Sequence, residues 1–192
     1  MPALASGFVE MVRGLGLSQV NLVGHSTGGL IALLAILEAP QLFHKAVLLD
    51  PVAADGIQFG PEMYDAFSKM REDRAFCESV MVGTIHNGQA SDPLVQGLVD
   101  DAFQVNGMIW HGIPDALKEI DIRSELKKIN QPILVMHGEF DTLLPKEKSA
   151  AISRGVQNGE FMEMKGHGHS MNVESLEKFA NVINEFLYES ES

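Results

Sequence analysis

Ser26 lies between glycines in the segment "VNLVGHSTGGLIALLAILEAP", residues 20–40, and fits the pattern G-x-S-x-G. A serine hydroxyl is a weak nucleophile until a base takes its proton, and that base needs a carboxylate to orient it. Because serine and glycine are both common in this chain, the pattern alone is a weak signal. Its context strengthens it, since an apolar strand precedes it and a helix follows. The bland alternative is a glycine-rich turn whose serine caps the helix.

A candidate acid and a candidate base follow two later apolar runs. Asp141, in "MHGEFDTLLP", comes just after the predicted strand 133–137, and His169, in "KGHGHSMN", comes just after the predicted strand 161–164. The carboxyl ends of parallel strands meet at one edge of a sheet, so both side chains are expected beside Ser26. The order Ser, Asp, His along the chain is that of one class of serine hydrolases.

Other assignments of these residues remain open. His167 is an alternative base, and Glu139 and Asp50 are alternative acids. Asp141 is alternatively a turn residue and His169 a surface histidine. Two histidines at 167 and 169 are also a possible metal pair, but no cysteine pair or H-E-x-x-H motif supports one. Of the other histidines, His137 is expected to be buried and hydrogen-bonded, and three have no recognisable context: His44, His86 and His111.

Alternating apolar strands and helices must position these groups. The spacing of apolar residues predicts strands at 20–23, 45–50, 133–137 and 161–164, and helices near 4–15, 30–37, 145–156 and 176–187. Strands that are apolar on both faces and alternate with helices are typical of a parallel sheet. The fold class is therefore α/β, with a mostly parallel sheet of about four strands and flanking helices.

The middle of the chain has a different character. From about residue 53 to 124, Met and Phe residues are scattered among Asp, Gly and Asn with weak helical periodicity. We interpret this segment as a helical insertion into a core formed by 1–52 and 125–192. Its apolar side chains would suit the lid of an apolar pocket, although Met and Phe more often fill a core.

The quoted segments, together with "KGHGHSMNVESLEKFANVINEFL", resemble the α/β-hydrolase superfamily in its serine-nucleophile branch. The resemblance covers nearly the whole chain and implies that Ser26 is the nucleophile, His169 the base and Asp141 the orienting acid. It also implies that the N–H of Thr27 donates to the oxyanion, and it makes 53–124 the cap. His25, beside the serine, is grouped with Thr27 as a candidate substrate-binding residue, although its ring is expected to point into the turn. No cofactor or metal is implied.

The main departure from the family is how early the serine comes. In the family the serine turn follows the fifth of about eight strands, and an earlier His-Gly loop gives a second oxyanion donor. This chain reaches Ser26 after one predicted strand, so a truncated fold is expected, and loss of one donor would cost about 3 kcal/mol of transition-state stabilisation. The strand 20–23 would then lie at an open edge, which predicts a homodimer that covers it.

Composition narrows the function classes. The formal net charge of -12 argues against nucleic acid or an anionic membrane as a partner. No apolar run approaches membrane-spanning length, no secretory leader is evident and Cys77 is alone, so a cytoplasmic protein is expected. The first hypothesis is a serine hydrolase that cleaves a small carboxylic ester, thioester or lactone. The alternative is a non-catalytic or weakly active remnant that serves as a binding or regulatory module.

Overall fold

The computed structural model describes residues 1–188 and contains one parallel sheet. Its four strands are β1 (Val20–His25), β2 (Phe43–Leu49), β3 (Pro132–Gly138) and β4 (Asn158–Met164), in the order β1-β2-β3-β4. The predicted fold class is confirmed, and so is each predicted strand. The last strand begins at Asn158 instead of Phe161, because its first residues are polar or exposed and carry no apolar signal.

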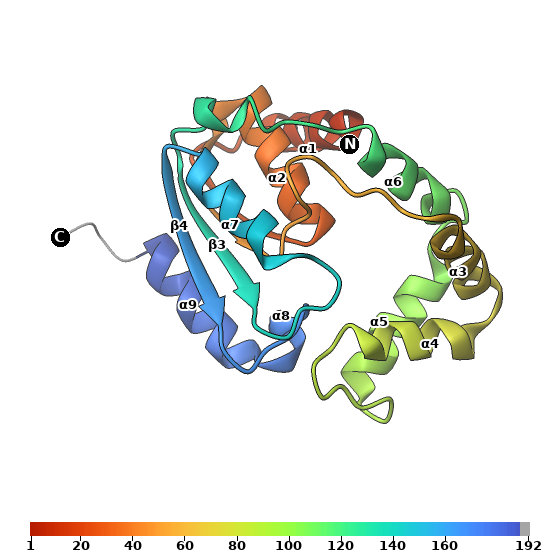
Figure 1. The fold of residues 1–192 in the computed structure, drawn as a ribbon. Helices are drawn as coiled ribbons and strands as arrows, with labels where there is room; N and C mark the ends of the chain where they lie inside the picture. The colour runs from red at the N-terminus through yellow and green to blue at the C-terminus, as the bar shows by residue number, and fades with distance from the viewer. Residues whose placement is uncertain (189–192) are drawn as a thin grey trace.

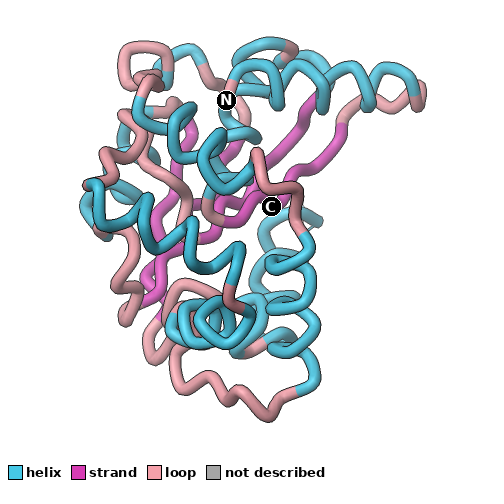
Figure 2. Tube along the Cα trace, turned by 90° about the vertical axis from the view of Figure 1, so that its right-hand side faces the viewer, coloured by secondary structure: helices cyan, strands magenta, loops and turns pink. Residues whose placement is uncertain are grey.

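Helices cover both faces of this sheet (Figures 1 and 2). The helices of the core are α1 (Pro2–Gly14), α2 (Thr27–Glu38), α7 (Lys146–Gly155), α8 (Met171–Glu174) and α9 (Leu176–Tyr188), with 3-10 turns at Pro40–Leu42 and Leu126–Lys128. Successive side chains of a strand point to opposite faces, so β2 contributes to two apolar layers. Ala46 and Leu48 pack with α1, α2 and α7, and Val47 and Leu49 pack with α8 and α9.

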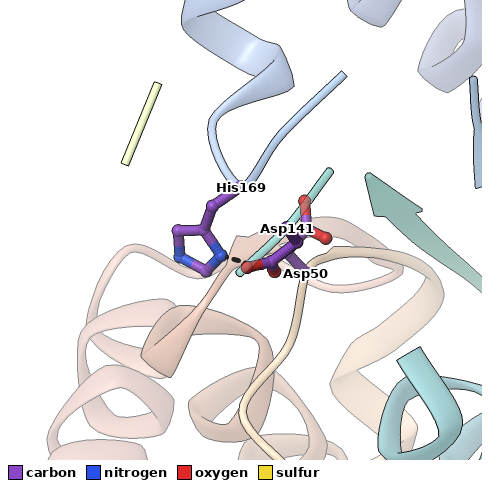
Figure 3. A group of neighbouring side chains, drawn as sticks. All are labelled: Asp50, Asp141 and His169. Atoms are coloured by element: carbon purple, nitrogen blue, oxygen red, sulfur yellow. Dashed lines mark hydrogen bonds and ion pairs between the residues drawn. The ribbon is translucent and has the colours of Figure 1, made fainter. Parts of the chain in front are cut away.

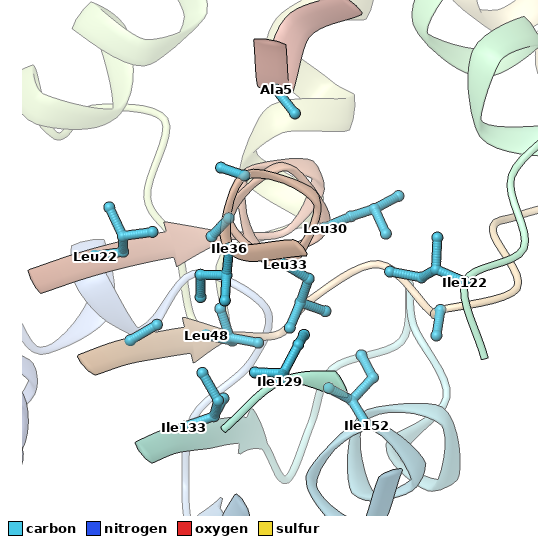
Figure 4. Packing of buried hydrophobic residues seen from close by; sticks show 14 of the residues in the cluster. Ala5, Leu22, Leu30, Leu33, Ile36, Leu48, Ile122, Ile129, Ile133 and Ile152 are labelled. Carbon is cyan, nitrogen blue, oxygen red and sulfur yellow. The ribbon is translucent and has the colours of Figure 1, made fainter. Parts of the chain in front are cut away.

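The larger of these layers is centred on α2. This helix lies between the sheet and α1 and is apolar on nearly every side, and its Leu30, Leu33 and Ile36 are fully buried (Figure 4). An apolar stripe so wide is typical of a helix that is buried on more than one side. The packing of α2 therefore fixes the position of the turn that precedes it, which carries Ser26.

One edge of the sheet is open. β1 pairs with β2 on one side, and within residues 1–188 no strand pairs with its other side. Val23 of this edge strand is 48% exposed, although its neighbour Val47 in β2 is fully buried. An exposed apolar side chain on an edge strand is the feature expected of the open edge.

The predicted insertion is helical. It contains α3 (Pro61–Glu72), α4 (Arg74–Gly83), α5 (Pro93–Gln104) and α6 (Ile109–Lys118), which lie to the right of the sheet in Figure 1. Its own small core contains Met70, Cys77 and Val99, all buried. Cys77 is therefore the apolar filler that a single buried thiol usually is. No helix among residues 1–188 is long and apolar enough to cross a bilayer.

Candidate active site

Ser26 occupies a strained turn between β1 and α2. Its backbone has φ 54° and ψ −119°, a conformation that non-glycine residues rarely adopt, and its N–H donates to the Leu49 carbonyl over 2.9 Å. Close packing makes a glycine necessary at position 24, because a Cβ there would lie 2.6 Å from the Gly28 carbonyl oxygen. Thr27 is the first residue of α2. Its N–H therefore has no acceptor within the helix and lies at the positive, N-terminal end of the helix dipole.

His169 and Asp141 form a buried hydrogen-bonded pair. Nδ1 of His169 lies 2.8 Å from Oδ2 of Asp141, and the two side chains are 8% and 0% exposed. Oδ1 of Asp141 accepts from the N–H groups of Leu143 (2.7 Å) and Leu144 (3.1 Å). Burial alone favours the neutral acid, but the hydrogen bond and charge of His169 and the two amides outweigh it, so the pKa of Asp141 lies below its usual range.

The loop that carries His169 crosses the end of β3 at very close range. A Cβ on Gly138 would lie 2.0 Å from the Gly168 carbonyl oxygen, so only glycine allows the crossing. On the other side, Nε2 of His25 donates to the His169 carbonyl oxygen over 2.8 Å, and the two rings lie 4.8 Å apart. Burial, and then the nearby charge of His169, lowers the pKa of His25 to about 4. His25 is thus a neutral donor that ties the serine turn to the histidine loop.

An apolar cavity of about 470 Å³ connects the serine turn with the insertion. Ser26, Thr27 and His169 line it together with residues of the four inserted helices, among them Met63, Phe67, Met70, Met81 and Trp110. Met and Phe side chains of the insertion therefore line a cavity, and several of them also pack in its own small core. His25 does not line this cavity, and its predicted contact with substrate stays a prediction. In the described chain Ser26 and His169 share this wall without a hydrogen bond; catalytic hydrogen bonds are often long in free enzymes.

Asp50 lies beside this pair (Figure 3). It is fully buried with φ 42°, and its Oδ1 accepts from the Gly138 N–H over 2.8 Å. Oδ2 has no partner among the described residues. Burial, and then the proximity of Asp141, raises the pKa of Asp50 to about 8, so the group is mostly neutral at pH 7. A neutral acid does not stabilise an imidazolium, which favours Asp141 over Asp50 as the orienting acid.

The remaining alternatives lie away from the cavity. Glu139 accepts from Lys165 (3.2 Å) and from the Gly166 N–H (2.9 Å), and His167 Nδ1 contacts the Lys165 carbonyl (2.8 Å). His137 is 1% exposed and its Nδ1 lies 3.0 Å from Ser149 Oγ, as expected of a buried, hydrogen-bonded histidine. These contacts give Glu139 and His167 structural roles in the loop.

One group of side chains has the composition of a metal site. Asp50, Asp141 and His169 offer ligand atoms that all lie within 4.8 Å of one another. However, Asp141 and His169 are already bonded to each other, and Asp50 is held in its neutral form. Because a metal needs deprotonated ligands, this arrangement fits a proton-sharing network better than a cation.

Sequence reasoning missed Glu174. Its Oε1 accepts from the N–H groups of His86 (2.9 Å) and Ser170 (3.3 Å), and its Oε2 accepts from the Gly168 N–H (2.8 Å). One carboxylate therefore joins the insertion to the loop of His169. The sequence offered one sign of this role: Glu174 comes four residues after Ser170, and the free backbone N–H groups at the start of a helix need acceptors.

Comparison with known proteins now places the chain in a family. A family model described as "alpha/beta hydrolase fold" matches residues 3–176. The chain belongs to the alpha/beta hydrolase family and is an enzyme of that type.

Its relatives include several hydrolases. 2-Hydroxymuconate semialdehyde hydrolase from Pseudomonas putida is 24% identical over 196 residues, which cover 96% of this chain and 68% of that protein. An esterase from Exiguobacterium antarcticum has a TM-score of 0.86 at 23% identity, covering 96% of this chain and 72% of its own. The enol-lactonase from Burkholderia xenovorans has a TM-score of 0.82 at 20% identity, and the match covers 96% of this chain and 72% of that chain. These structural matches share the fold.

Proposed function

We propose that the protein is a serine hydrolase of small carboxylic esters, thioesters or lactones, with Ser26, His169 and Asp141 as its catalytic triad. The observation that carries this proposal is the buried His169–Asp141 hydrogen bond at the wall of the same cavity that Ser26 lines. The names of two similar structures, an esterase and an enol-lactonase, agree with carboxylic-ester chemistry.

The reaction proceeds in two half-reactions. Nε2 of His169 takes the proton of Ser26 as its Oγ bonds to the carbonyl carbon, and the carbonyl π electrons move to oxygen. The N–H of Thr27 stabilises that oxyanion, aided by the N-terminal end of α2. The imidazolium then protonates the leaving oxygen or sulfur as its bond to the acyl carbon breaks. Water repeats the sequence on the acyl-enzyme, releasing the acid and restoring Ser26.

The orienting acid keeps the imidazole in the required tautomer. Asp141 accepts the Nδ1–H of His169, which leaves the Nε2 lone pair free to face Ser26. Two backbone amides hold Asp141 as a carboxylate, so it stabilises the imidazolium without taking its proton.

Covalent labelling with a fluorophosphonate tests the proposal. We expect the wild type to be labelled at Ser26, and Ser26→Ala and His169→Ala to lose the label, because only a base-activated serine attacks phosphorus. Ser175→Ala, a serine outside the cavity, is the matched control and should be labelled like the wild type.

Two outcomes would contradict this assignment. Labelling that survives in Ser26→Ala would place the nucleophile elsewhere. A wild type that takes no label, with native circular dichroism, would favour the non-catalytic binding module instead.

A further inference from the structure

A second cavity is also lined by His169. Its volume is about 260 Å³, and it is lined by the loop after α4 and by the loop after β3. It shares His169, Thr84 and Leu143 with the apolar cavity but does not reach Ser26 or Thr27. The two cavities therefore adjoin at His169, Thr84 and Leu143.

The walls of the two cavities differ in chemistry. The larger one is lined almost entirely by aliphatic, Met and aromatic side chains. The smaller one presents His86, Asn87 and Thr142, and within residues 1–188 the ring nitrogens of His86 and the hydroxyl of Thr142 have no hydrogen-bond partner. Apart from histidine, neither wall contains a charged residue. Free donors and acceptors in a neutral cavity suit a polar, uncharged ligand.

The polar wall is also held in place. The ring of His86 stacks on Phe140 with centroids 4.4 Å apart, and the N–H of His86 donates to Glu174, which also holds the loop of His169. The side of the cavity that comes from the insertion is thus attached to the side that comes from the core. Such attachment reduces the ordering that a ligand must impose on the site.

We infer that the smaller cavity binds the leaving alcohol, and that the preferred substrate joins an apolar acyl chain to a polar, uncharged alcohol such as a polyol. This inference rests on the proposed function. The acyl group must lie beside Ser26 and Thr27, where the carbonyl is attacked, and the cavity there is apolar. The leaving oxygen must lie within reach of the imidazole that protonates it. The alcohol is therefore directed to the smaller cavity, which is lined by His169 but not by Ser26 or Thr27.

A matched pair of esters tests the inference. 1-Octanoylglycerol and propyl octanoate share the acyl chain and the three-carbon alcohol, but only the glycerol ester has two further hydroxyls. We expect kcat/KM to be about tenfold higher for the glycerol ester, the effect of one net hydrogen bond. His86→Phe keeps an aromatic ring against Phe140 and removes the nitrogens, and Thr142→Val removes the hydroxyl. Each should bring the ratio towards one.

Control variants separate the two cavities. Ile109→Ala, in the apolar wall, should change kcat/KM for both esters by the same factor and leave their ratio intact. His44→Phe, the same substitution at an exposed histidine on β2, should leave both values unchanged.

The outcomes distinguish the two proposals. A wild type that hydrolyses both esters at equal kcat/KM, or a preference that survives in His86→Phe and Thr142→Val, overturns the leaving-group assignment while the hydrolase stands. Failure to hydrolyse either ester, with no fluorophosphonate labelling, overturns the hydrolase and this inference with it. If labelling occurs without turnover, the two ethers 1-O-octylglycerol and octyl propyl ether can be compared for how well each slows fluorophosphonate labelling of Ser26. We expect the glycerol ether to protect better, and equal protection contradicts the inference.

Discussion

Two carboxyl groups at the site have opposite protonation preferences. Asp141 accepts hydrogen bonds from His169 and from two backbone amides, whereas Asp50 is buried with one oxygen unpaired. Their proximity means that both do not ionise easily, because two like charges at short range are costly. The surroundings therefore favour the ionised form of Asp141 and the neutral, protonated form of Asp50.

The buried proton of Asp50 makes stability depend on pH. Its folded-state pKa is about 8, whereas an unfolded aspartate has a pKa near 4, so between these values the folded chain binds a proton that the unfolded chain has released. The free energy of unfolding should then fall as pH rises, by about 1.4 kcal/mol per pH unit in that window. Asp50→Asn is always neutral and tolerates a positive φ, so its stability should lack this slope.

Urea unfolding of both proteins from pH 5 to 8 measures the effect. Other titrating groups are common to both, so the difference between the two free energies isolates Asp50. A difference that does not grow with pH would mean that Asp50 is ionised in the folded protein.

At the scale of elements, one carboxylate connects the loop after α4, the histidine loop and α8. Glu174→Ala would leave the N–H groups of His86, Gly168 and Ser170 without their acceptor. We expect kcat for propyl octanoate to fall about tenfold, because displacement of an imidazole by a fraction of an ångström weakens proton transfer. KM should change much less, since the apolar wall does not contain Glu174.

Glu174→Gln keeps one oxygen acceptor, so its kcat for propyl octanoate should lie between those of the wild type and Glu174→Ala. Glu177→Ala, at an exposed position in α9, is the matched control. Equal losses in kcat for Glu174→Ala and Glu177→Ala, or a loss confined to thermal stability, would argue against a positioning role.

Elements with a simple apolar pattern could be predicted from the sequence, and so could the residues that follow them. Ser26 directly follows β1, and Asp141 and His169 lie in the loops after β3 and β4, so the parallel order of the strands brings all three to one edge. Glu174 and the polar cavity could not be predicted in this way. Their positions depend on how the inserted helices fold back over the core, and the weak periodicity of 53–124 does not specify that packing.

At the scale of the whole molecule, the outer edge of β1 has no paired strand within residues 1–188. Val23 is exposed on this edge strand, and apolar edges of this kind promote association. We expect a two-fold dimer that pairs the β1 strands or buries the adjoining face. Sedimentation velocity at micromolar concentration should show a dimer, and Val23→Lys should shift the equilibrium towards monomer. A wild type that stays monomeric at every concentration would contradict this expectation.

The insertion leaves the core after β2 and returns before β3, and these two strands are neighbours in the sheet. The two ends of the insertion are therefore attached to one pair of neighbouring strands, and its helices α3–α6 take no part in the strand pairing. We expect that the wall facing the cavity can change the selection of substrates, provided that Leu117 and Ile122, which pack in the main core, and the contact of His86 with Glu174 are kept.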